Sequence, residues 1–208
     1  MTNFKNYLLI GLLSSGLIFT SCNGDDDAPE EEDEVEVITD VTLVFTNNAD
    51  NTDVVKARAK DPDGMGAQDL QVLDTIKLTS GVTYTLTFEI SNALDPDDVE
   101  DVGEEIEEED DEHQLFFAFT DGAFSSPMGD GNIDTTSDPI NYEDEDDDEN
   151  PVGLETTWTA GNPRTNGKFR VKLQHQPDVK TATSTATTGD TDFDLTFVLN
   201  ISAAAESS

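Results

Sequence analysis

The feature that most limits the fold of this chain is a series of short segments in which apolar and polar residues alternate. Residues 193–201 place Phe, Leu, Phe, Leu and Ile at every second position, and residues 81–90 do the same with Val, Tyr, Leu, Phe and Ile. A period of two brings these side chains onto one face of a β-strand. The alternation therefore predicts strands that bury one face and expose the other.

Six further segments are rich in β-branched residues or alternate in the same way. They are residues 37–45, 53–60, 70–78, 113–119, 154–159 and 168–175. Turn signals such as Asp61-Pro62-Asp63-Gly64 separate them. Because no rhythm of strand, helix and strand is visible, we predict an all-β fold over residues 37–202: an antiparallel β-sandwich of immunoglobulin-like or jelly-roll type.

One acidic segment departs from this pattern. Val99, Val102 and Ile106 are spaced so that they share one face of a helix. Asp95 can cap such a helix, and Pro96 suits its first turn. The sequence thus predicts one short acidic helix within residues 96–111, laid across the sandwich.

The N-terminus has the organisation of a secretory signal. Lys5 precedes an apolar run over residues 7–19, which is too short to span a bilayer as a helix, since that takes roughly 20 residues. Small residues stand directly before Cys22, as in a bacterial lipobox, where the cysteine becomes the lipidated first residue. We predict cleavage after residue 21 and lipidation of Cys22; the alternative is an ordinary secretory signal that contains a cysteine.

Residues 22–36 follow as a lipidated cysteine and an acidic segment with little apolar content, which predicts a disordered tether. The acidic cluster behind Cys22 resembles the surface-export signal of Bacteroidota lipoproteins. We expect an outer-membrane lipoprotein at the cell surface, with the periplasmic face as the alternative, held to the bilayer by its acyl anchor. Residues 203–208 are expected to form a C-terminal tail.

The charge of the chain is strongly negative. It has 47 Asp and Glu against 10 Lys and Arg, a net charge of −37, and loss of Lys5 with the signal makes it −38. Such a surface repels phosphates and anionic lipids, so nucleic-acid binding is disfavoured. It attracts cations and basic partners, although acidity also serves solubility alone. We expect a monomer.

Two constellations are candidate cation sites. The first joins Glu109, Asp110 and His113 on one helical face, with His175 as a second imidazole if the two strand ends converge; this donor set suits a transition metal such as zinc or copper. The alternative is two surface histidines without a ligand. The second is a calcium loop with the ligand spacing of Asp144, Asp146, Asp148, Asn150 and Glu155. Its sixth position is Glu149 instead of glycine, so a solvated acidic loop is the alternative.

Signals of catalysis are weak. There is no Gly-x-Ser-x-Gly sequence, and Phe116, Phe117, Phe119 and Phe124 are expected to belong to the core. A hydrolase with paired carboxylates would need a concave face lined by convergent Asp or Glu. We therefore expect a non-enzymatic protein.

Four segments together resemble a family of uncharacterised Bacteroidota lipoproteins, some of which are labelled type 1 periplasmic-binding-fold proteins. The segments are residues 104–114, 150–155, 170–177 and 189–195. The resemblance implies export and lipidation and no known activity. The α/β fold of that label disagrees with the strand pattern, which we follow.

These features favour a surface-anchored binding domain for a cation or a metal-bearing ligand, with a transition metal or Ca²⁺ as the candidate ion. By analogy, such a domain would hand its ligand to an outer-membrane transporter. The alternative is a structural or adhesive lipoprotein without a specific small ligand.

Overall fold

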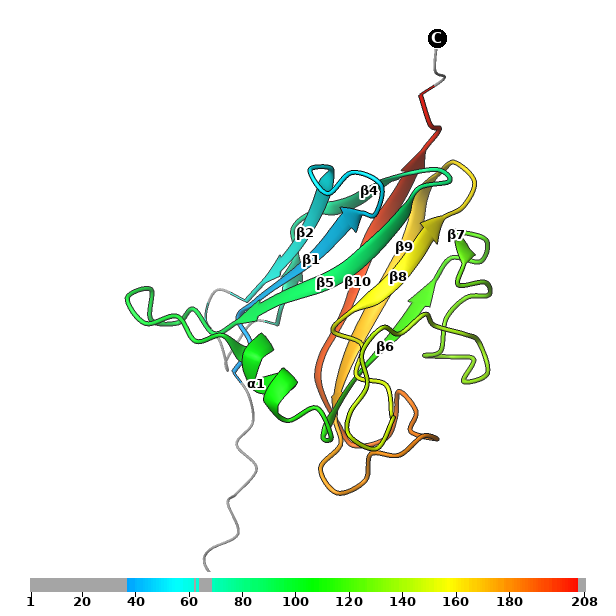
Figure 1. Cartoon of the computed structure of the whole chain (residues 1–208). Helices are drawn as coiled ribbons and strands as arrows, with labels where there is room; N and C mark the ends of the chain where they lie inside the picture. Colours follow the sequence, from blue (N-terminus) through cyan, green and yellow to red (C-terminus); the bar gives the residue numbers. More distant parts are fainter. Residues whose placement is uncertain (1–36, 62, 64–68, 206–208) are drawn as a thin grey trace, which may run out of the picture. The chain divides into compact units, whose positions relative to one another are not determined.

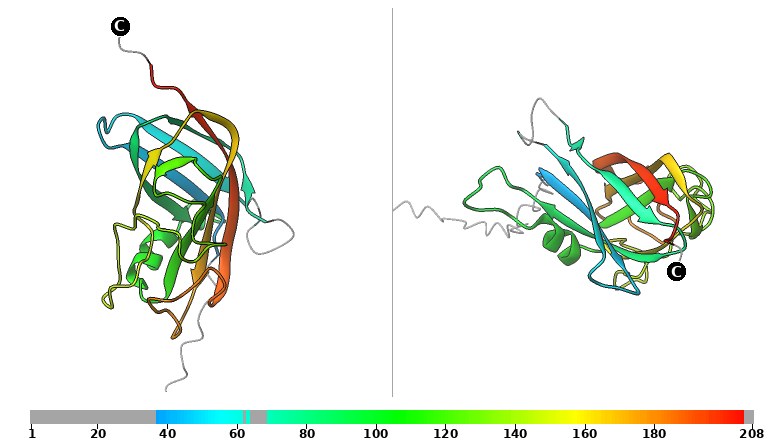
Figure 2. Two further views of the ribbon diagram at one scale, coloured as in Figure 1. Left: turned by 90° about the vertical axis from the view of Figure 1, so that its right-hand side faces the viewer. Right: turned by 90° about the horizontal axis from the view of Figure 1, so that it is seen from above.

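The computed structural model describes residues 37–61, 63 and 69–205, which form two facing β-sheets (Figure 1). One sheet has the strand order β3-β2-β1-β5-β8-β7, and the other has the order β4-β10-β9-β6. Figure 2 shows β1 and β2 in one layer and β9 and β10 in the other. The predicted all-β sandwich is confirmed.

The six-stranded sheet consists of β1 (Asp40–Asn47), β2 (Val54–Lys60), β3 (Gln71–Val72), β5 (Thr83–Ser91), β7 (Phe124–Ser126) and β8 (Thr156–Ala160). The four-stranded sheet consists of β4 (Thr75–Thr79), β6 (His113–Phe119), β9 (Arg164–His175) and β10 (Asp190–Ser202). A single helix among the described residues, α1 (Val102–Glu108), connects β5 to β6.

The strands differ from the prediction in three respects. The single strand expected over residues 70–78 divides into β3 and β4, which belong to different sheets. β4 pairs with β10 in parallel, whereas all strands were predicted to be antiparallel. A parallel pair requires a long connection, here more than 100 residues, so no local pattern reveals it. The three-residue strand β7 was also missed.

An aromatic cluster fills the centre of the core. The ring of Trp158 contacts the rings of Phe117, Phe119, Phe124 and Phe169, with centroids 4.8 to 5.5 Å apart. All five side chains are buried, and Phe116 is buried as well although it lies outside the main core cluster, so the expected burial of the four phenylalanines of residues 116–124 is confirmed. Burial of each such side chain contributes roughly 1.5–3 kcal/mol to folding, so this cluster is a major stabilising element of the core.

The helix begins later than the sequence predicts. Asn92 and Glu100 pair through two main-chain hydrogen bonds (3.1 and 3.0 Å), which extends the end of β5 into a hairpin. Asp95 accepts hydrogen bonds within the turn of that hairpin instead of capping a helix. Val99 is consequently 54% exposed, and the predicted start at Pro96 is wrong.

Asp101 is the actual N-cap of α1, because its side chain accepts a hydrogen bond from Glu104 N (3.3 Å). Val102 and Ile106 are buried and pack the helix against β5. Their spacing is the part of the predicted helical face that the structure confirms. Because these two residues face the core, the acidic side of α1 faces solvent.

Candidate functional site

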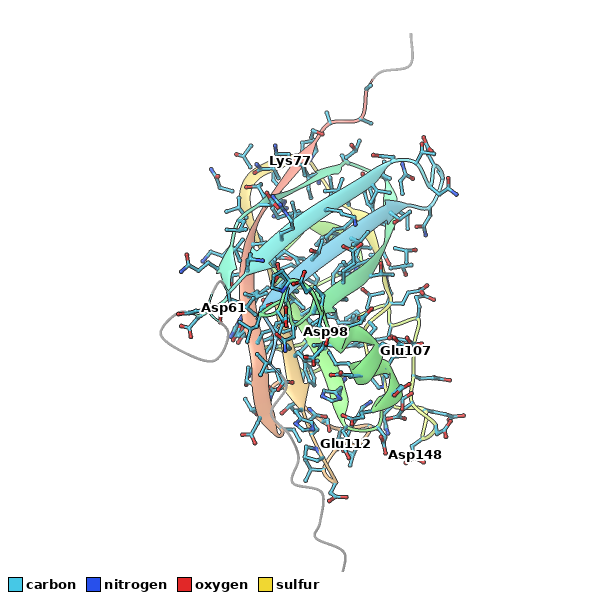
Figure 3. All side chains as sticks on the ribbon, turned by 90° about the vertical axis from the view of Figure 1, so that its left-hand side faces the viewer. Asp61, Lys77, Asp98, Glu107, Glu112 and Asp148 are labelled. Carbon is cyan, nitrogen blue, oxygen red and sulfur yellow. The ribbon has the colours of Figure 1, made fainter. Side chains whose placement is uncertain are left out.

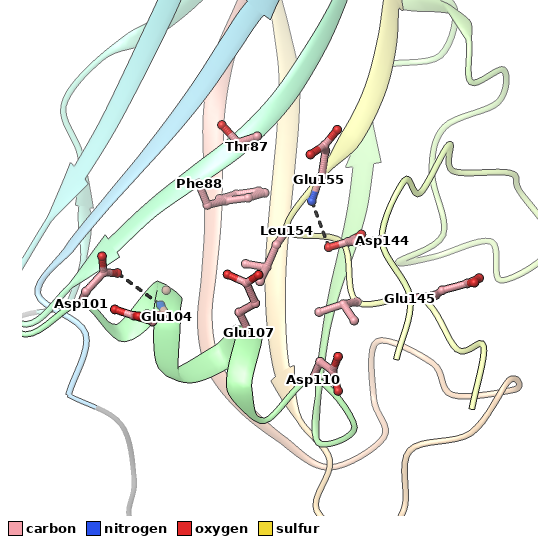
Figure 4. A pocket seen from close by; sticks show the side chains of 12 residues that line it. Thr87, Phe88, Asp101, Glu104, Glu107, Asp110, Asp144, Glu145, Leu154 and Glu155 are labelled. Carbon is pink, nitrogen blue, oxygen red and sulfur yellow. Dashed lines mark hydrogen bonds between the residues drawn. The ribbon is translucent and has the colours of Figure 1, made fainter. Parts of the chain in front are cut away.

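An acidic cleft of about 550 Å³ lies between α1 and the segment 144–155 (Figure 4). We call it the acidic cleft. Seven of its lining residues carry carboxylates, and none is a lysine, arginine or histidine. The seven are Asp101, Glu104, Glu107, Asp110, Asp144, Glu145 and Glu155.

One wall of the acidic cleft comes from α1. Because Val102 and Ile106 face the core, Glu104 and Glu107 project from the solvent side of the helix, about one turn apart. Repulsion between such neighbours costs a few tenths of a kcal/mol in an exposed helix. A bound cation would remove this cost.

The other wall is fixed by Asp144. Its two carboxylate oxygens accept hydrogen bonds from Gly153 N (2.8 Å) and Glu155 N (3.0 Å), and they hold the segment in a closed loop. Gly153 has φ 99°, and a Cβ there would lie 2.9 Å from both Leu115 and Tyr142, so only glycine fits. Burial raises the pKa of Asp144 despite the main-chain hydrogen bonds that lower it.

The floor of the acidic cleft is apolar. Val152 is buried, and Phe88 and Leu154 are partly buried against the core. Carboxylates above an apolar floor suit a ligand that has both a positive charge and a hydrocarbon body. The surrounding low-polarity surface also strengthens each charge interaction relative to open water.

Asp110 lies where the acidic cleft meets a second acidic cluster. Burial raises the pKa of Asp110, the nearby Lys180 ammonium opposes this rise, and the carboxylates of Asp146, Asp111 and Asp147 add to it. A cation in the cleft would stabilise the ionised carboxylate and so lower this pKa. Binding of a cation should therefore weaken as the pH falls.

The predicted calcium loop holds a different cation, the ammonium of Lys180. Lys180 Nζ lies 2.9 Å from Asp146 Oδ2 and donates a hydrogen bond to Asp110 O (2.5 Å). The side chains of Lys180 and Asp146 are each only 1% exposed. Burial works against the ionised Asp146, but hydrogen bonds from Asn150 and Lys180 outweigh it and hold the pKa of Asp146 below its usual range.

The other predicted calcium ligands do not converge with Asp146 on one ion position. Asn150 donates two hydrogen bonds to Asp146, and Asp148 has an exposed side chain. Asp144 is engaged by the main chain of Gly153 and Glu155. We call Lys180, Asp146, Asn150 and the main-chain oxygen of Asp110 the Lys180 cluster.

The two predicted imidazole ligands do come together. His113 and His175 are partners in the register of β6 and β9, and their rings stack with centroids 4.7 Å apart and planes 5° from parallel. An imidazole nitrogen binds a metal in the plane of its ring, so two stacked, parallel rings do not aim at one ion. His113 Nδ1 instead lies 3.0 Å from Glu109 O, and His175 Nε2 lies 3.3 Å from Glu112 Oε2.

Metal coordination gains no support from these geometries. Within residues 37–61, 63 and 69–205, no group of three or more His, Cys, Asp or Glu side chains is placed to hold a metal ion. Glu109 contacts His113 through its main-chain oxygen, and Asp110 accepts a hydrogen bond from Lys180 through its own main-chain oxygen. The transition-metal and calcium assignments stay predictions.

Sequence reasoning missed Lys180 and most of the acidic cleft. A lysine in a threonine-rich stretch gives no sign that it will enter an acidic cluster more than 30 residues earlier. Asp101, Glu104 and Glu107 were visible only as parts of a charged run. Their spacing of three on a helix with a buried face was the available signal.

The predicted signal peptide, Cys22 and the acidic tether lie outside the described residues. Among those described, no helix has the length and apolar character needed to cross a membrane. Comparison with family models, curated proteins and solved structures finds no match for this chain. The resemblance to Bacteroidota lipoproteins therefore stays a prediction, and the site has to be interpreted from its own chemistry.

Proposed function

We propose that this chain is an exported, lipid-anchored domain that binds a cationic ligand in the acidic cleft without catalysing a reaction. The observation that carries the proposal is the lining of the cleft, with seven carboxylates, no basic side chain and an apolar floor. A concave surface of one charge sign concentrates ligands of the opposite sign.

The chemistry of the cleft favours an organic cation over a bare metal ion. The carboxylates are spread over two walls of a space of about 550 Å³ instead of meeting at one point. Phe88 and Leu154 offer contacts to methylene groups that a metal ion cannot use. A polyamine or a lysine-rich peptide segment has both the charges and the hydrocarbon body.

The course of the chain is compatible with a membrane-proximal role. The described chain enters β1 at Asp40, which pairs with Ser91 at the end of β5, and α1 follows soon after. The described chain therefore begins at the end of the domain that carries α1 (Figure 1). In our proposal, lipidated Cys22 anchors the domain to the membrane, and an outer-membrane transporter would receive the ligand.

Calorimetric titration of the tag-free chain lacking residues 1–21, with Cys22 replaced by serine, tests the binding proposal. Spermidine at 150 mM salt is the probe, and we expect saturable binding that weakens as salt rises, because the attraction is screened. Removing two carboxylates with Glu104→Gln and Glu107→Gln should weaken binding about fivefold, since an exposed charge pair contributes roughly 0.2–1 kcal/mol.

A matched control separates the cleft from the general charge. Glu108 and Glu109 are exposed residues of the same region that do not line the cleft. The pair Glu108→Gln and Glu109→Gln removes the same charge and should leave the affinity within about twofold. An equal loss of spermidine affinity in the two double variants, or no saturable binding at all, would overturn the proposal. The alternative of a structural or adhesive surface protein would then be favoured.

Zinc and calcium titrations test the metal form of the same proposal. Zinc binding that disappears when His175 is replaced by alanine would support the predicted histidine site. Zinc binding that survives this change would discard that site. Mass spectrometry of the membrane-extracted protein tests the anchor, and an unmodified thiol at Cys22 would refute it.

A further inference from the structure

The outer edge of β2 exposes main-chain hydrogen-bonding groups. Asn47 at the end of β1 faces Asp53 just before β2, and Asn47 N donates a hydrogen bond to Asp53 O (3.0 Å). In an antiparallel ladder, such hydrogen-bonded pairs recur at every second residue. The odd-numbered residues of β2 therefore bond to β1. The N–H and C=O groups of its even-numbered residues, Val54, Lys56 and Arg58, point away from β1.

Only part of this edge is covered within the described residues. Arg58 O accepts a hydrogen bond from Leu73 N (2.9 Å), where β3 begins to pair with β2. For Val54 and Lys56, the described residues provide no main-chain partner on this side. Two donors and two acceptors are thus available for an added strand.

The edge strand β6 of the other sheet shows the contrast. A long segment lies along it, and Leu115 N and Phe119 N donate to Val152 O and Asp130 O (2.7 and 2.8 Å). The fold therefore closes the edge of β6 and leaves part of β2 open.

The open edge borders a groove of about 550 Å³ that is basic, unlike the rest of the chain. Lys56, Arg58 and Lys77 line it with one carboxylate, Asp74, although the whole chain has only 10 lysines and arginines. Figure 3 shows Lys77 toward one end of the domain, and Glu112 and Asp148 toward the opposite end. At physiological salt, charges are screened over about 8 Å, so the local basic charge governs what binds there.

Apolar side chains complete the groove. Val54 and Leu73 are 42% and 57% exposed, and Val55 is partly buried on the inner side of β2. A strand laid along β2 would place alternate side chains beside Val55 on the inner side and beside Lys56 on the outer side. The groove is therefore complementary to a peptide in which acidic and apolar residues alternate.

We propose that this groove binds an extended acidic segment of a partner protein, which adds to β2 as a further strand. Main-chain bonds to Val54 and Lys56 would supply affinity, and carboxylates facing Lys56 and Lys77 would supply specificity. The existing pairs Lys56–Glu89 and Arg58–Asp74 show that these cations accept carboxylates, and both pairs are exposed enough to exchange at little cost. A second copy fits less well, because β2 against β2 would bring lysines and arginines of both copies together.

The test uses a fluorescent seven-residue peptide of alternating glutamate and valine, titrated into the same Cys22→Ser chain and followed by anisotropy. We expect saturable binding, and slower hydrogen exchange of the Val54 and Lys56 amides in the complex. Lys77→Glu should weaken binding about tenfold. The control Lys168→Glu makes the same charge change at an exposed strand residue outside the groove and should have less than a twofold effect.

A peptide methylated on its main-chain nitrogens separates strand addition from simple charge attraction. It should bind at least tenfold more weakly, because it lacks the donors of the ladder. Equal binding of the methylated peptide, equal effects of the two lysine variants, or no binding of the parent peptide would each overturn the proposal. Dimerisation that is lost in a Lys56→Glu variant would also overturn it, by assigning the edge to a second copy.

Discussion

The acidic cleft and the Lys180 cluster are built from the same two acidic segments, yet they differ in how their charge is neutralised. In the Lys180 cluster, a lysine of this chain lies 2.9 Å from Asp146 in a nearly dry environment. In the acidic cleft, seven carboxylates line a solvent-open space without a basic neighbour among the lining residues. The first arrangement holds the loop together, whereas the second is available to a cation from outside.

A run of carboxylates therefore does not by itself indicate a binding site. Burying a charge is unfavourable unless a partner compensates it, so the carboxylate that is pulled inside acquires Lys180. The carboxylates that stay at the surface need no internal partner. The position of the Lys180 ammonium therefore determines which acidic residues remain available to a ligand.

The largest predicted effect is that of Lys180→Met, which keeps the side-chain length and removes the charge. It leaves Asp146 buried without its cation, and breaking a buried pair in this way costs roughly 3–5 kcal/mol. We expect a loss of about 3 kcal/mol in the free energy of unfolding, measured by urea denaturation. Lys168→Met, at an exposed position, should change it by less than about 0.5 kcal/mol. Equal effects would show that Lys180 does not have a special role.

The same pair should give a characteristic dependence on pH. The pKa of Asp146 is lowered in the folded state, because hydrogen bonds from Asn150 and Lys180 outweigh the cost of burial. Its stabilising contribution is therefore fully present above its unfolded pKa of about 3.9 and is lost as the pH falls through the lower folded value. The stability difference between the wild type and a Lys180→Met, Asp146→Asn variant should shrink on acidification below pH 4. A constant difference down to pH 2 would contradict the assignment.

Much of the fold was predictable because a period of two is a local signal. The alternation in residues 81–90 and 193–201 matches β5 and β10, whose inward residues such as Tyr84, Leu86, Phe197 and Leu199 are buried. The parallel pairing of β4 with β10 was not predictable, because it joins segments that are far apart in sequence. The helix start was wrong because the pairing of Asn92 with Glu100 overrides the local capping signal.

The site was predictable only in part, for the same reason. Strand periodicity allowed His113 and His175 to be expected at converging strand ends, but ring orientation depends on packing that the sequence does not reveal. The calcium spacing in residues 144–155 stays a prediction, and in the structure Asp144 and Asp146 accept hydrogen bonds from within that segment. It did not reveal that Lys180 would supply the cation.

A smaller effect would show whether Lys180 excludes an external ion. In a Lys180→Ala variant, Asp146 Oδ2 and Asp110 O lose their ammonium partner and are oxygen ligands of the kind calcium prefers. If the vacated position binds calcium with a dissociation constant near 1 mM, 10 mM calcium would stabilise the variant by about 1.4 kcal/mol. The wild type should respond to calcium no more than to sodium chloride of equal ionic strength. An equal response of both proteins would instead place a calcium site elsewhere in the chain.

The smallest predicted effect concerns Glu149, at the position where a calcium loop would have glycine. Glu149 has φ 63°, a left-handed conformation that costs a non-glycine residue roughly 1–2 kcal/mol. Glu149→Gly relieves this cost, but the extra freedom of glycine in the unfolded chain offsets roughly 0.5–1 kcal/mol of the gain. We expect a net stabilisation of about 0.5 kcal/mol by urea denaturation. Asp147→Gly, where φ is not positive, should instead destabilise the domain by about the same amount. Neither change should alter spermidine affinity by more than about twofold, because neither residue lines the acidic cleft. A larger change would show that the loop of the Lys180 cluster and the acidic cleft are energetically coupled.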